Sequence, residues 1–262
     1  MLTFVGLGLY DERSITVAGR EAIADADRVF AEFYTSKLAG ARLDDVEAAH
    51  DTTIEVRSRE GVERDPDPIL DAAADGDAVF CTAGDTMIST THVDLRLRAH
   101  DRGIETRVIH GTTAEAAASS LTGLQNYRFG KATTLPFESS HGGEGVPDSV
   151  VETIEDNRQR GLHTLVFLDI KVEADREEYM SGDAAAGLLA EHWNDEALGV
   201  VVARAGSPEP VVTADTLDSL AAQSFGEPLH MLLIPGDLHY VERDALVELG
   251  GAPKAAVEEL LV

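Results

Sequence analysis

The chain has 262 residues, of which 44% are hydrophobic, and its 48 acidic against 21 basic side chains give a net charge of -27. This length and composition predict a globular protein with one large or two moderate domains, and the lack of a basic stripe argues against nucleic-acid binding. No apolar run approaches the roughly 20 residues of a membrane span, and the start, MLTFVGLG, has no basic region or cleavage site, so we expect a cytoplasmic protein without a membrane partner.

The acidic residues are spread along the whole chain instead of forming one run. Such a surface repels itself in dilute salt, whereas at molar salt the Debye length falls to about 3 Å and the repulsion is screened. We interpret the charge as an adaptation to a very salty cytoplasm. The alternative, an acidic patch for a basic partner, would predict a local run of acids.

Strands and helices alternate over the first 110 residues. We expect strands at 2–5, 28–33, 52–56, 78–81 and 106–109, with helices near 15–23, 43–49, 66–74 and up to about 101. Asp11 or Ser14 is expected to cap the first helix, and one of Ser89 to Thr91 the fourth. This alternation predicts a mostly parallel sheet with helices on its faces.

The second half of the chain predicts another α/β unit. Strands are expected at 132–135, 164–170, 198–203, 211–213 and 229–234, with helices up to about 160, at 183–193, at 217–223 and from about 240. The glycine- and serine-rich stretch 137–147 is expected to be a flexible surface loop. We therefore divide the chain into an N-terminal domain, 1–111, and a C-terminal domain, 112–262.

Several predicted strands end in small residues flanked by glycine. These ends are Gly6-Leu7-Gly8-Leu9, Gly84-Asp85, Gly111-Thr112-Thr113, Ala203-Arg204-Ala205-Gly206 and Pro235-Gly236. Ligands of open α/β sheets bind at the carboxyl ends of the strands, where glycine lets the backbone approach a ligand closely. Asp85 is therefore either part of a ligand site or a turn residue that satisfies its own backbone.

Other catalytic signatures are missing from the sequence. There is no HExxH, no histidine pair at i, i+4 with acidic support, no GxSxG and no GxxxxGK[ST], so we expect no metal site, serine hydrolase or P-loop. The single cysteine, Cys81, rules out an internal disulfide, and its apolar neighbours predict a packed core thiol. The GxG after the first strand is weak as a dinucleotide motif because Asp11 occupies the place of the third glycine.

The chain resembles the diphthine synthase family in a series of blocks that occur in order from end to end. They include GLGLYDER from Gly6, FAEFYTS from Phe30, GLHTLVFLDIK from Gly161, ARAGS from Ala203 and PGDLH from Pro235. The family belongs to the tetrapyrrole methylases, whose fold is two α/β domains with a cofactor cleft between them. The resemblance also implies an archaeal and, with the charge, halophilic origin.

This resemblance implies an S-adenosylmethionine-dependent N-methyltransferase. Members of the family methylate the amino group of the modified histidine, the diphthamide precursor, on translation elongation factor 2, which gives diphthine and S-adenosylhomocysteine. They are homodimers. Carried onto matching positions, the family's cofactor contacts are Leu9, Asp85, Ile88, Thr113, Ala114, Leu168, Ala205 and His230.

Leu168 and His230 lie within or at the start of predicted strands, where a core leucine and a satisfied histidine would be ordinary. The chain departs from the superfamily at Thr86, where proline is usual, and at Thr113, where serine is common; we expect a shifted loop at most.

The sequence identifies no catalytic residue. A sulfonium already activates its methyl group, so positioning of the amine and exclusion of water are the main requirements. Tyr34, His92 and Asp169 lie near strand ends but are expected to be structural or to orient the substrate. Two alternatives stay open: a tetrapyrrole (precorrin-type) methyltransferase, and a non-catalytic regulator that binds the cofactor.

Overall fold

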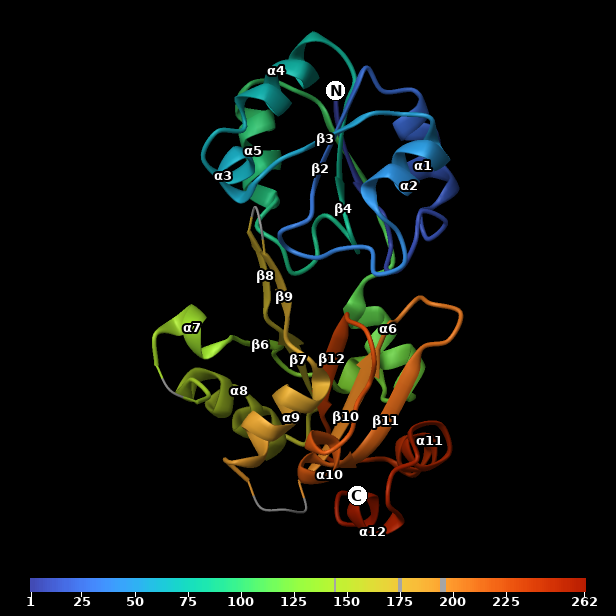
Figure 1. The fold of residues 1–262 in the computed structure, drawn as a ribbon, viewed down its shortest axis with the longest axis vertical. Helices are drawn as coiled ribbons and strands as arrows, with labels where there is room; N and C mark the ends of the chain where they lie inside the picture. Colours follow the sequence, from blue (N-terminus) through green and yellow to red (C-terminus); the bar gives the residue numbers. More distant parts are fainter. Residues whose placement is uncertain (144, 174–175, 194–196) are drawn as a thin grey trace. The chain divides into compact units, whose positions relative to one another are not determined.

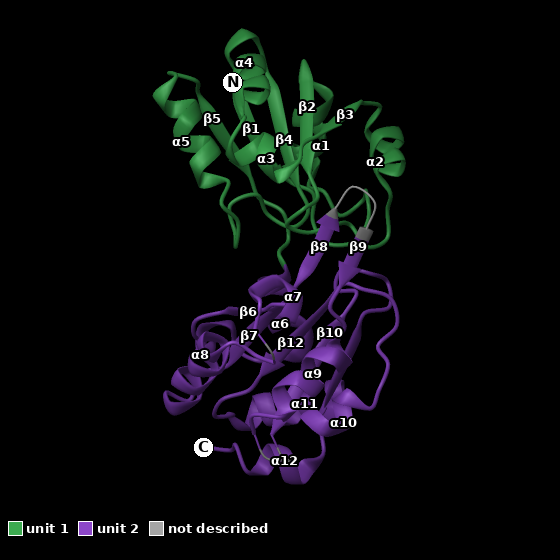
Figure 2. Cartoon of the chain, turned by 60° about the vertical axis from the view of Figure 1, so that its left-hand side comes forward, with its two compact units in different colours: residues 1–113 green, residues 114–262 purple. Residues whose placement is uncertain are grey.

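The computed structural model describes residues 1–143, 145–173, 176–193 and 197–262. These form two compact units, residues 1–113 and 114–262, coloured separately in Figure 2. Each unit has its own sheet and its own helices, which confirms the predicted α/β class. No helix in these ranges is long and apolar enough to cross a membrane. The domain limit at residue 111 stays a prediction.

The first unit contains one fully parallel sheet. Its five strands lie in the order β3-β2-β4-β1-β5. Their bounds are β1 (Leu2–Gly6), β2 (Arg28–Glu32), β3 (Ile54–Val56), β4 (Ala78–Thr82) and β5 (Thr106–Ile109). Every residue of β1 and β4 is buried, as their continuous apolar sequences require for strands covered on both faces.

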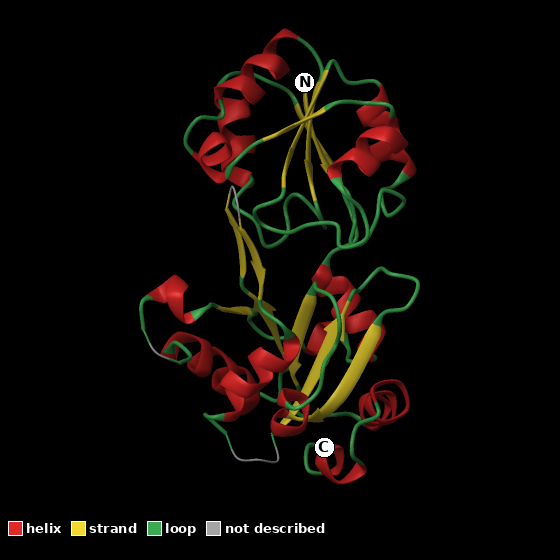
Figure 3. Cartoon of the chain, in the orientation of Figure 1, coloured by secondary structure: helices red, strands yellow, loops and turns green. Residues whose placement is uncertain are grey.

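Helices cover both faces of this sheet, as Figures 1 and 3 show. They are α1 (Val17–Ala24), α2 (Leu43–His50), α3 (Arg59–Glu63), α4 (Asp67–Asp75) and α5 (Val93–Asp101). One core joins Val5 of β1 to Ile23 of α1, and a second joins Phe4 to Leu95 of α5. The connections that leave the adjacent strands β1 and β4 therefore run to opposite faces of the sheet. That arrangement is the topological switch point at which open α/β sheets bind ligands.

The second unit contains a mixed sheet in the order β11-β10-β12-β7-β6. Strands β6 and β7 are parallel, and the other pairs are antiparallel. The strands are β6 (Thr133–Leu135), β7 (Thr164–Leu168), β10 (Leu198–Ala203), β11 (Val211–Thr216) and β12 (His230–Ile234). A separate hairpin joins β8 (Ile170–Glu173) and β9 (Arg176–Tyr179).

Two apolar cores cover the faces of this second sheet, one packed with α8, α9 and α10 and the other with α6, α11 and α12. The helices are α6 (Ala114–Thr122), the 3-10 helix η1 (Asn126–Arg128), α7 (Glu138–His141), α8 (Asp148–Gln159), α9 (Gly182–Ala190), α10 (Leu217–Ala221), α11 (Tyr240–Gly250) and α12 (Lys254–Glu258).

The structure corrects several local expectations. Thr16 caps α1 by accepting from the backbone N–H of Gly19, whereas Ser14 and Asp11 bond each other in the preceding loop. The N-cap position of α5 is taken by His92, whose side chain makes no capping bond to the helix, and Ser89 lies in a turn before it with a φ of 57°. The stretch 137–147, expected to be a loop, contains the short helix α7; residue 144 of this stretch lies outside the described residues.

Candidate functional site

The loops that follow β1, β4 and β5 meet at one edge of the first unit, which we call the strand-end edge: residues 6–9, 84–88 and 110–113. Gly8 and Gly84 form an isolated antiparallel bridge, in which each backbone N–H donates to the other's carbonyl at 3.2 and 2.7 Å. Two loops far apart in sequence are thus tied backbone to backbone at the switch point.

Glycine is required where these loops touch. A Cβ on Gly6 would lie 2.5 Å from both the carbonyl oxygen of Gly84 and the backbone nitrogen of Gly111, a distance that no side chain tolerates. Gly84 is different, because its φ is 76° and a Cβ there would meet no atom within 4 Å. The three loops of the edge are therefore packed backbone against backbone at Gly6, whereas the space beside Gly84 is open and gives a ligand access to the backbone.

Asp85 holds the strand-end edge together. The residue is 3% exposed. Its Oδ1 accepts from the backbone N–H of Met87 at 2.9 Å, and its Oδ2 accepts from the N–H of Gly111 at 3.2 Å and from Nδ1 of His110 at 2.8 Å. The Met87 bond is that of a turn residue, but the other two join the β4 and β5 loops. Protein donors thus contact both oxygens of this carboxylate.

His110 is the residue of this edge that the sequence interpretation missed. Its ring contacts the buried carboxylate of Asp85 through Nδ1, while its side chain is 75% exposed. The one signal in the sequence was its position, directly after β5 and before Gly111.

A buried polar cluster lies behind the β4 loop. His92 donates from Nδ1 to the carbonyl of Thr86 at 3.1 Å, and its Nε2 lies 3.5 Å from both the Tyr34 hydroxyl and Glu32. Burial lowers the pKa of His92 and raises that of Glu32 and that of Tyr34. Tyr34 and His92 thus support the loop from within the protein. Thr86, in the place of the usual proline, is fully buried, and its hydroxyl has no partner among the described residues.

The other predicted contacts of this half lie at or beside the edge. Leu9 and Thr113 are half-buried, and Ile88 is exposed. Ala114, which follows Thr113 in the sequence, is half-buried and begins α6 of the second unit.

The contacts predicted in the second unit are more enclosed. Leu168 ends β7 and is packed in an apolar core, and the half-buried Ala205 packs against the other core. His230 begins β12; its Nδ1 accepts from the N–H of Gly182 at 3.0 Å, and its Nε2 donates to the carbonyl of Glu227 at 2.9 Å. Burial lowers the pKa of His230. Its ring is therefore fully used inside the unit, so that any ligand contact would come from its backbone.

Asp169, a candidate of the sequence interpretation, has a structural role. Its Oδ2 accepts from the backbone N–H of Phe137 at 2.9 Å and from the hydroxyl of Ser140 at 2.6 Å, which anchors α7. Cys81 is fully buried in β4, and burial raises the pKa of its thiol to about 12, which confirms a core thiol.

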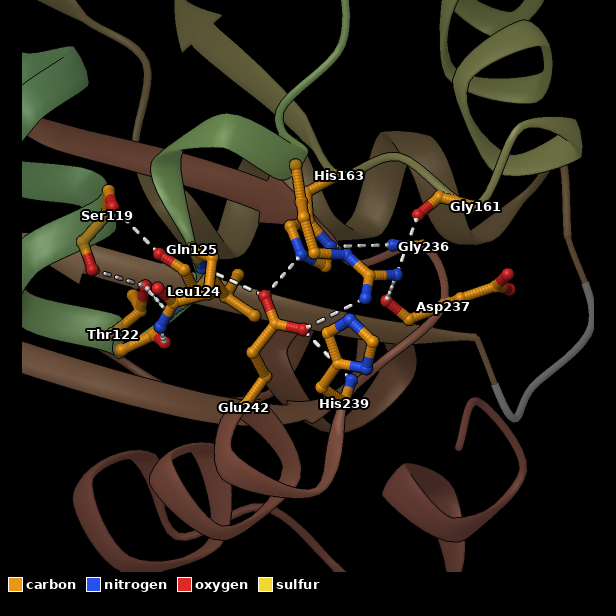
Figure 4. Close-up of polar contacts among 12 residues, drawn as sticks. Ser119, Thr122, Leu124, Gln125, Gly161, His163, Gly236, Asp237, His239 and Glu242 are labelled. Atoms are coloured by element: carbon orange, nitrogen blue, oxygen red, sulfur yellow. Dashed lines mark hydrogen bonds and ion pairs between the residues drawn. The ribbon is translucent and has the colours of Figure 1, made fainter. Parts of the chain in front are cut away.

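A second carboxylate–histidine pair lies deep in the second unit, where Figure 4 shows Glu242 of α11 at the centre of several donors. Its Oε1 accepts from Nε2 of His163 at 3.0 Å and from the N–H of Gln125 at 2.8 Å, while Oε2 accepts from the N–H of His239 at 2.9 Å. Burial raises the pKa of Glu242, but these bonds outweigh burial and leave it below its ordinary value. Burial lowers the pKa of His163.

Comparisons with known proteins identify relatives over the full length of the chain. Residues 1–221 match the family model described as "Tetrapyrrole (Corrin/Porphyrin) Methylases". The chain is 71% identical to a diphthine synthase of Halorubrum lacusprofundi, with 99% of this chain and 100% of the relative covered. It is 69% identical to one of Halobacterium salinarum, with 98% and 100% covered. These organisms are halophilic archaea, in agreement with the acidic composition.

Solved structures give the same result. A crystal structure of diphthine synthase matches with a TM-score of 0.89 and 36% identity, with 99% of both chains covered. A putative diphthine synthase from Entamoeba histolytica matches with a TM-score of 0.82 and 31% identity, with 100% of this chain and 98% of the other covered.

Proposed function

The chain belongs to the tetrapyrrole methylase family and is a methyltransferase of diphthamide synthesis, and from this premise we propose that it methylates the amino group of the modified histidine on translation elongation factor 2, giving diphthine, with S-adenosylmethionine as donor. The observation that carries the proposal is the 71% identity over the whole length of a diphthine synthase. A tetrapyrrole methyltransferase would not require that likeness.

The strand-end edge fits the proposed donor. The side of Gly84 is open, Ile88 is exposed beside it, and the loops of β1, β4 and β5 converge there. We propose that the contacts are Leu9, Asp85, Ile88, Thr113, Ala114, Leu168, Ala205 and His230. His230 would contribute its backbone, because protein groups contact both nitrogens of its ring.

The task of the chain's own residues is then to position the donor and the amine. When bound, S-adenosylmethionine supplies a methyl group that its sulfonium already activates. Asp85 fixes the β4 loop to the β5 loop, and the Gly8–Gly84 bridge fixes it to the β1 loop, so the contacts are preorganised. Preorganised positioning of donor and amine is the main source of rate in such a transfer.

A transfer assay tests the proposal. Purified protein in molar salt is incubated with methyl-labelled S-adenosylmethionine and elongation factor 2 that carries the 3-amino-3-carboxypropyl histidine. We expect label on the factor and none on a factor with unmodified histidine. Label on a tetrapyrrole precursor would support a tetrapyrrole methyltransferase instead. Cofactor binding without transfer to either substrate would support a regulator.

We further propose that the protein acts in the cytoplasm as a homodimer. Light scattering coupled to size exclusion in molar salt checks the assembly, with a mass near twice that of the chain, 28.0 kDa, as the expected result. A mass of one chain at the concentrations used in the transfer assay would contradict it.

A further inference from the structure

Two properties of His110 are not explained by a role in stabilising the fold. Its ring is held by a buried carboxylate, with Nδ1 at 2.8 Å from Oδ2 of Asp85, yet the side chain is 75% exposed. A histidine that only stabilised the loop would gain more from burial of its ring. Exposed side chains held in one orientation at a strand end are typical of functional residues.

The hydrogen bonds of Asp85 define the tautomer of this ring. Oδ1 accepts from the N–H of Met87, and Oδ2 accepts from the N–H of Gly111, so both oxygens act as acceptors. The same Oδ2 contacts Nδ1 of His110, which must therefore donate. In the neutral imidazole the lone pair is then on Nε2. Asp85 thus prepares Nε2 as a proton acceptor.

Three other histidines show the contrast. In His163 and His230 protein groups contact both ring nitrogens, and His92 places both of its nitrogens among buried groups. All three are buried. In the described contacts of His110, only Nδ1 has a partner, and Asp85 is the charged group against the ring. A carboxylate that orients a histidine whose other nitrogen is free is the arrangement of a general base and its orienting residue.

The position of His110 indicates which proton it would accept. The residue lies on the strand-end edge, next to Gly111 and bonded to Asp85, beside the switch point where open α/β sheets bind ligands. The amine that is methylated is protonated near neutral pH, and an ammonium has no lone pair for attack. A proton acceptor beside the donor site would remove that obstacle.

We propose that His110 is the general base that deprotonates the substrate amine, an inference that rests on the proposed function. The N–H proton of the ammonium passes to Nε2, and the N–H electron pair becomes the nitrogen lone pair. That pair forms the bond to the methyl carbon while the carbon–sulfur pair moves to sulfur, which becomes a neutral thioether. The nitrogen regains a positive charge, and the imidazolium releases its proton to solvent from its exposed face. Asp85 is the positioning residue that holds the ring.

The main test compares His110→Asn with the intact protein. An asparagine amide can replace the Nδ1 donor to Asp85 but cannot accept a proton, so folding and S-adenosylhomocysteine affinity, measured by calorimetry, should stay within about twofold. We expect kcat at pH 7 to fall by about 10²-fold or more, with KM for elongation factor 2 nearly unchanged. Activity of the variant should rise about tenfold per pH unit, as the free amine becomes available, and added imidazole should restore part of it.

His100→Asn is the matched control, because His100 is an exposed histidine on α5. It should leave kcat and the pH profile unchanged. A kcat of His110→Asn within twofold of the intact protein from pH 6 to 9 would overturn the proposal. So would a loss of affinity for S-adenosylhomocysteine that accounts for the lost activity, since His110 would then be a binding residue.

A second readout does not depend on activity. Nitrogen NMR of the imidazole rings should show His110 protonated on Nδ1 at high pH in the intact protein, and this preference should weaken in Asp85→Asn. A ring that carries its proton on Nε2 would contradict the proposed acceptor. If the intact protein transfers no methyl group to elongation factor 2 while the NMR result holds, it is the proposed function that fails, and the base with it.

Discussion

In each unit of this protein a buried carboxylate accepts a hydrogen bond from a histidine ring, Asp85 from His110 and Glu242 from His163, and these two pairs differ in what they leave free. Glu242 and His163 are both fully buried, and Nδ1 of His163 also accepts from the N–H of Gly236 at 3.1 Å. Asp85 is as well enclosed, but its partner His110 has an exposed ring with one nitrogen free of described contacts. The first pair is closed within the fold, whereas the second has a side that faces solvent.

The difference shows how the same chemistry serves stability or function. A buried carboxylate must be hydrogen-bonded, and Glu242 satisfies this through donors from three separate chain segments, as Figure 4 shows. It therefore locks elements of the second unit together. Asp85 also joins two loops, but part of its bonding capacity goes to a side chain that packs against little else.

Removing the buried carboxylate should have the largest effect. Glu242→Ala leaves Nε2 of His163 without its acceptor and removes the charged partner of Arg128, whose side chain is 13% exposed, so we expect the free energy of unfolding to fall by about 3–5 kcal/mol. Guanidinium titration in molar salt measures this. In the control Glu258→Ala, which removes an exposed partner of Arg243, the loss should be about 0–1 kcal/mol. Equal losses would mean that the cluster of Glu242 stabilises no more than a surface pair.

Asp85→Ala should have a smaller effect on stability and a local effect on binding. Met87 and Gly111 each lose a hydrogen-bond acceptor, and we expect a loss of about 1–3 kcal/mol. Freed loops should also bind S-adenosylhomocysteine about tenfold more weakly, by calorimetry. Asp94→Ala, at an exposed ion pair on α5, is the control. Unchanged affinity in Asp85→Ala would mean that Asp85 is not needed for binding of the cofactor.

Acid should weaken the closed pair. Because burial lowers the pKa of His163, the unfolded chain takes up a proton near pH 6.5 that the folded state takes up only at lower pH. The free energy of unfolding should therefore fall by about 1.4 kcal/mol for each pH unit below about 6.5, until the pKa of His163 in the folded protein is reached. Other buried histidines with lowered pKa act in the same direction: His50, His92 and His230.

The lowered pKa of Glu242 adds a second loss below about pH 4.5, because its stabilisation disappears as pH falls through the folded pKa. Unfolding curves at constant salt from pH 7 to 4 check both limbs. A flat profile between pH 7 and 5 would show that the buried histidines are not held neutral.

The smallest effect is expected from the exposed partner. His110→Ala removes a ring that is 75% exposed, so the free energy of unfolding should change by about 0.5 kcal/mol or less. The same titration measures it. A loss comparable to that of Glu242→Ala would show that His110 is structural and would remove the distinction between the two pairs.

The sequence predicts most of the fold because apolar runs and glycine ends are local signals. The strand β4 and the parallel sheet of the first unit follow from such runs and their alternation with helices. It does not predict where the chain leaves a sheet: 164–170 forms one continuous strand pattern, yet β7 ends at Leu168, and from Ile170 the chain forms β8, which pairs with β9 instead of the main sheet. The strand with which a segment pairs is determined only when the whole unit assembles.

The site was predictable to the same extent. Gly84 and Asp85 are visible as a strand end, but the partner of Asp85 lies 25 residues away, and that of Glu242 lies 79 residues away. No local pattern indicates such pairs, because the fold alone brings them together. The prediction of the first helix cap failed for a local reason: Asp11 and Ser14 bond each other before the helix starts, and Thr16 caps α1 instead.

The place of β1 between β4 and β5 has a consequence for biosynthesis. The first strand of the chain pairs with β4 and β5, so its partners lie more than seventy residues downstream. As the chain emerges from the ribosome, Leu2–Gly6 stays an unpaired apolar segment until residue 82 has been made. Folding of this unit therefore starts late and depends on distant contacts, which slow folding and expose aggregation-prone strands. We therefore expect this nascent chain to be assisted by a chaperone at the ribosomal exit.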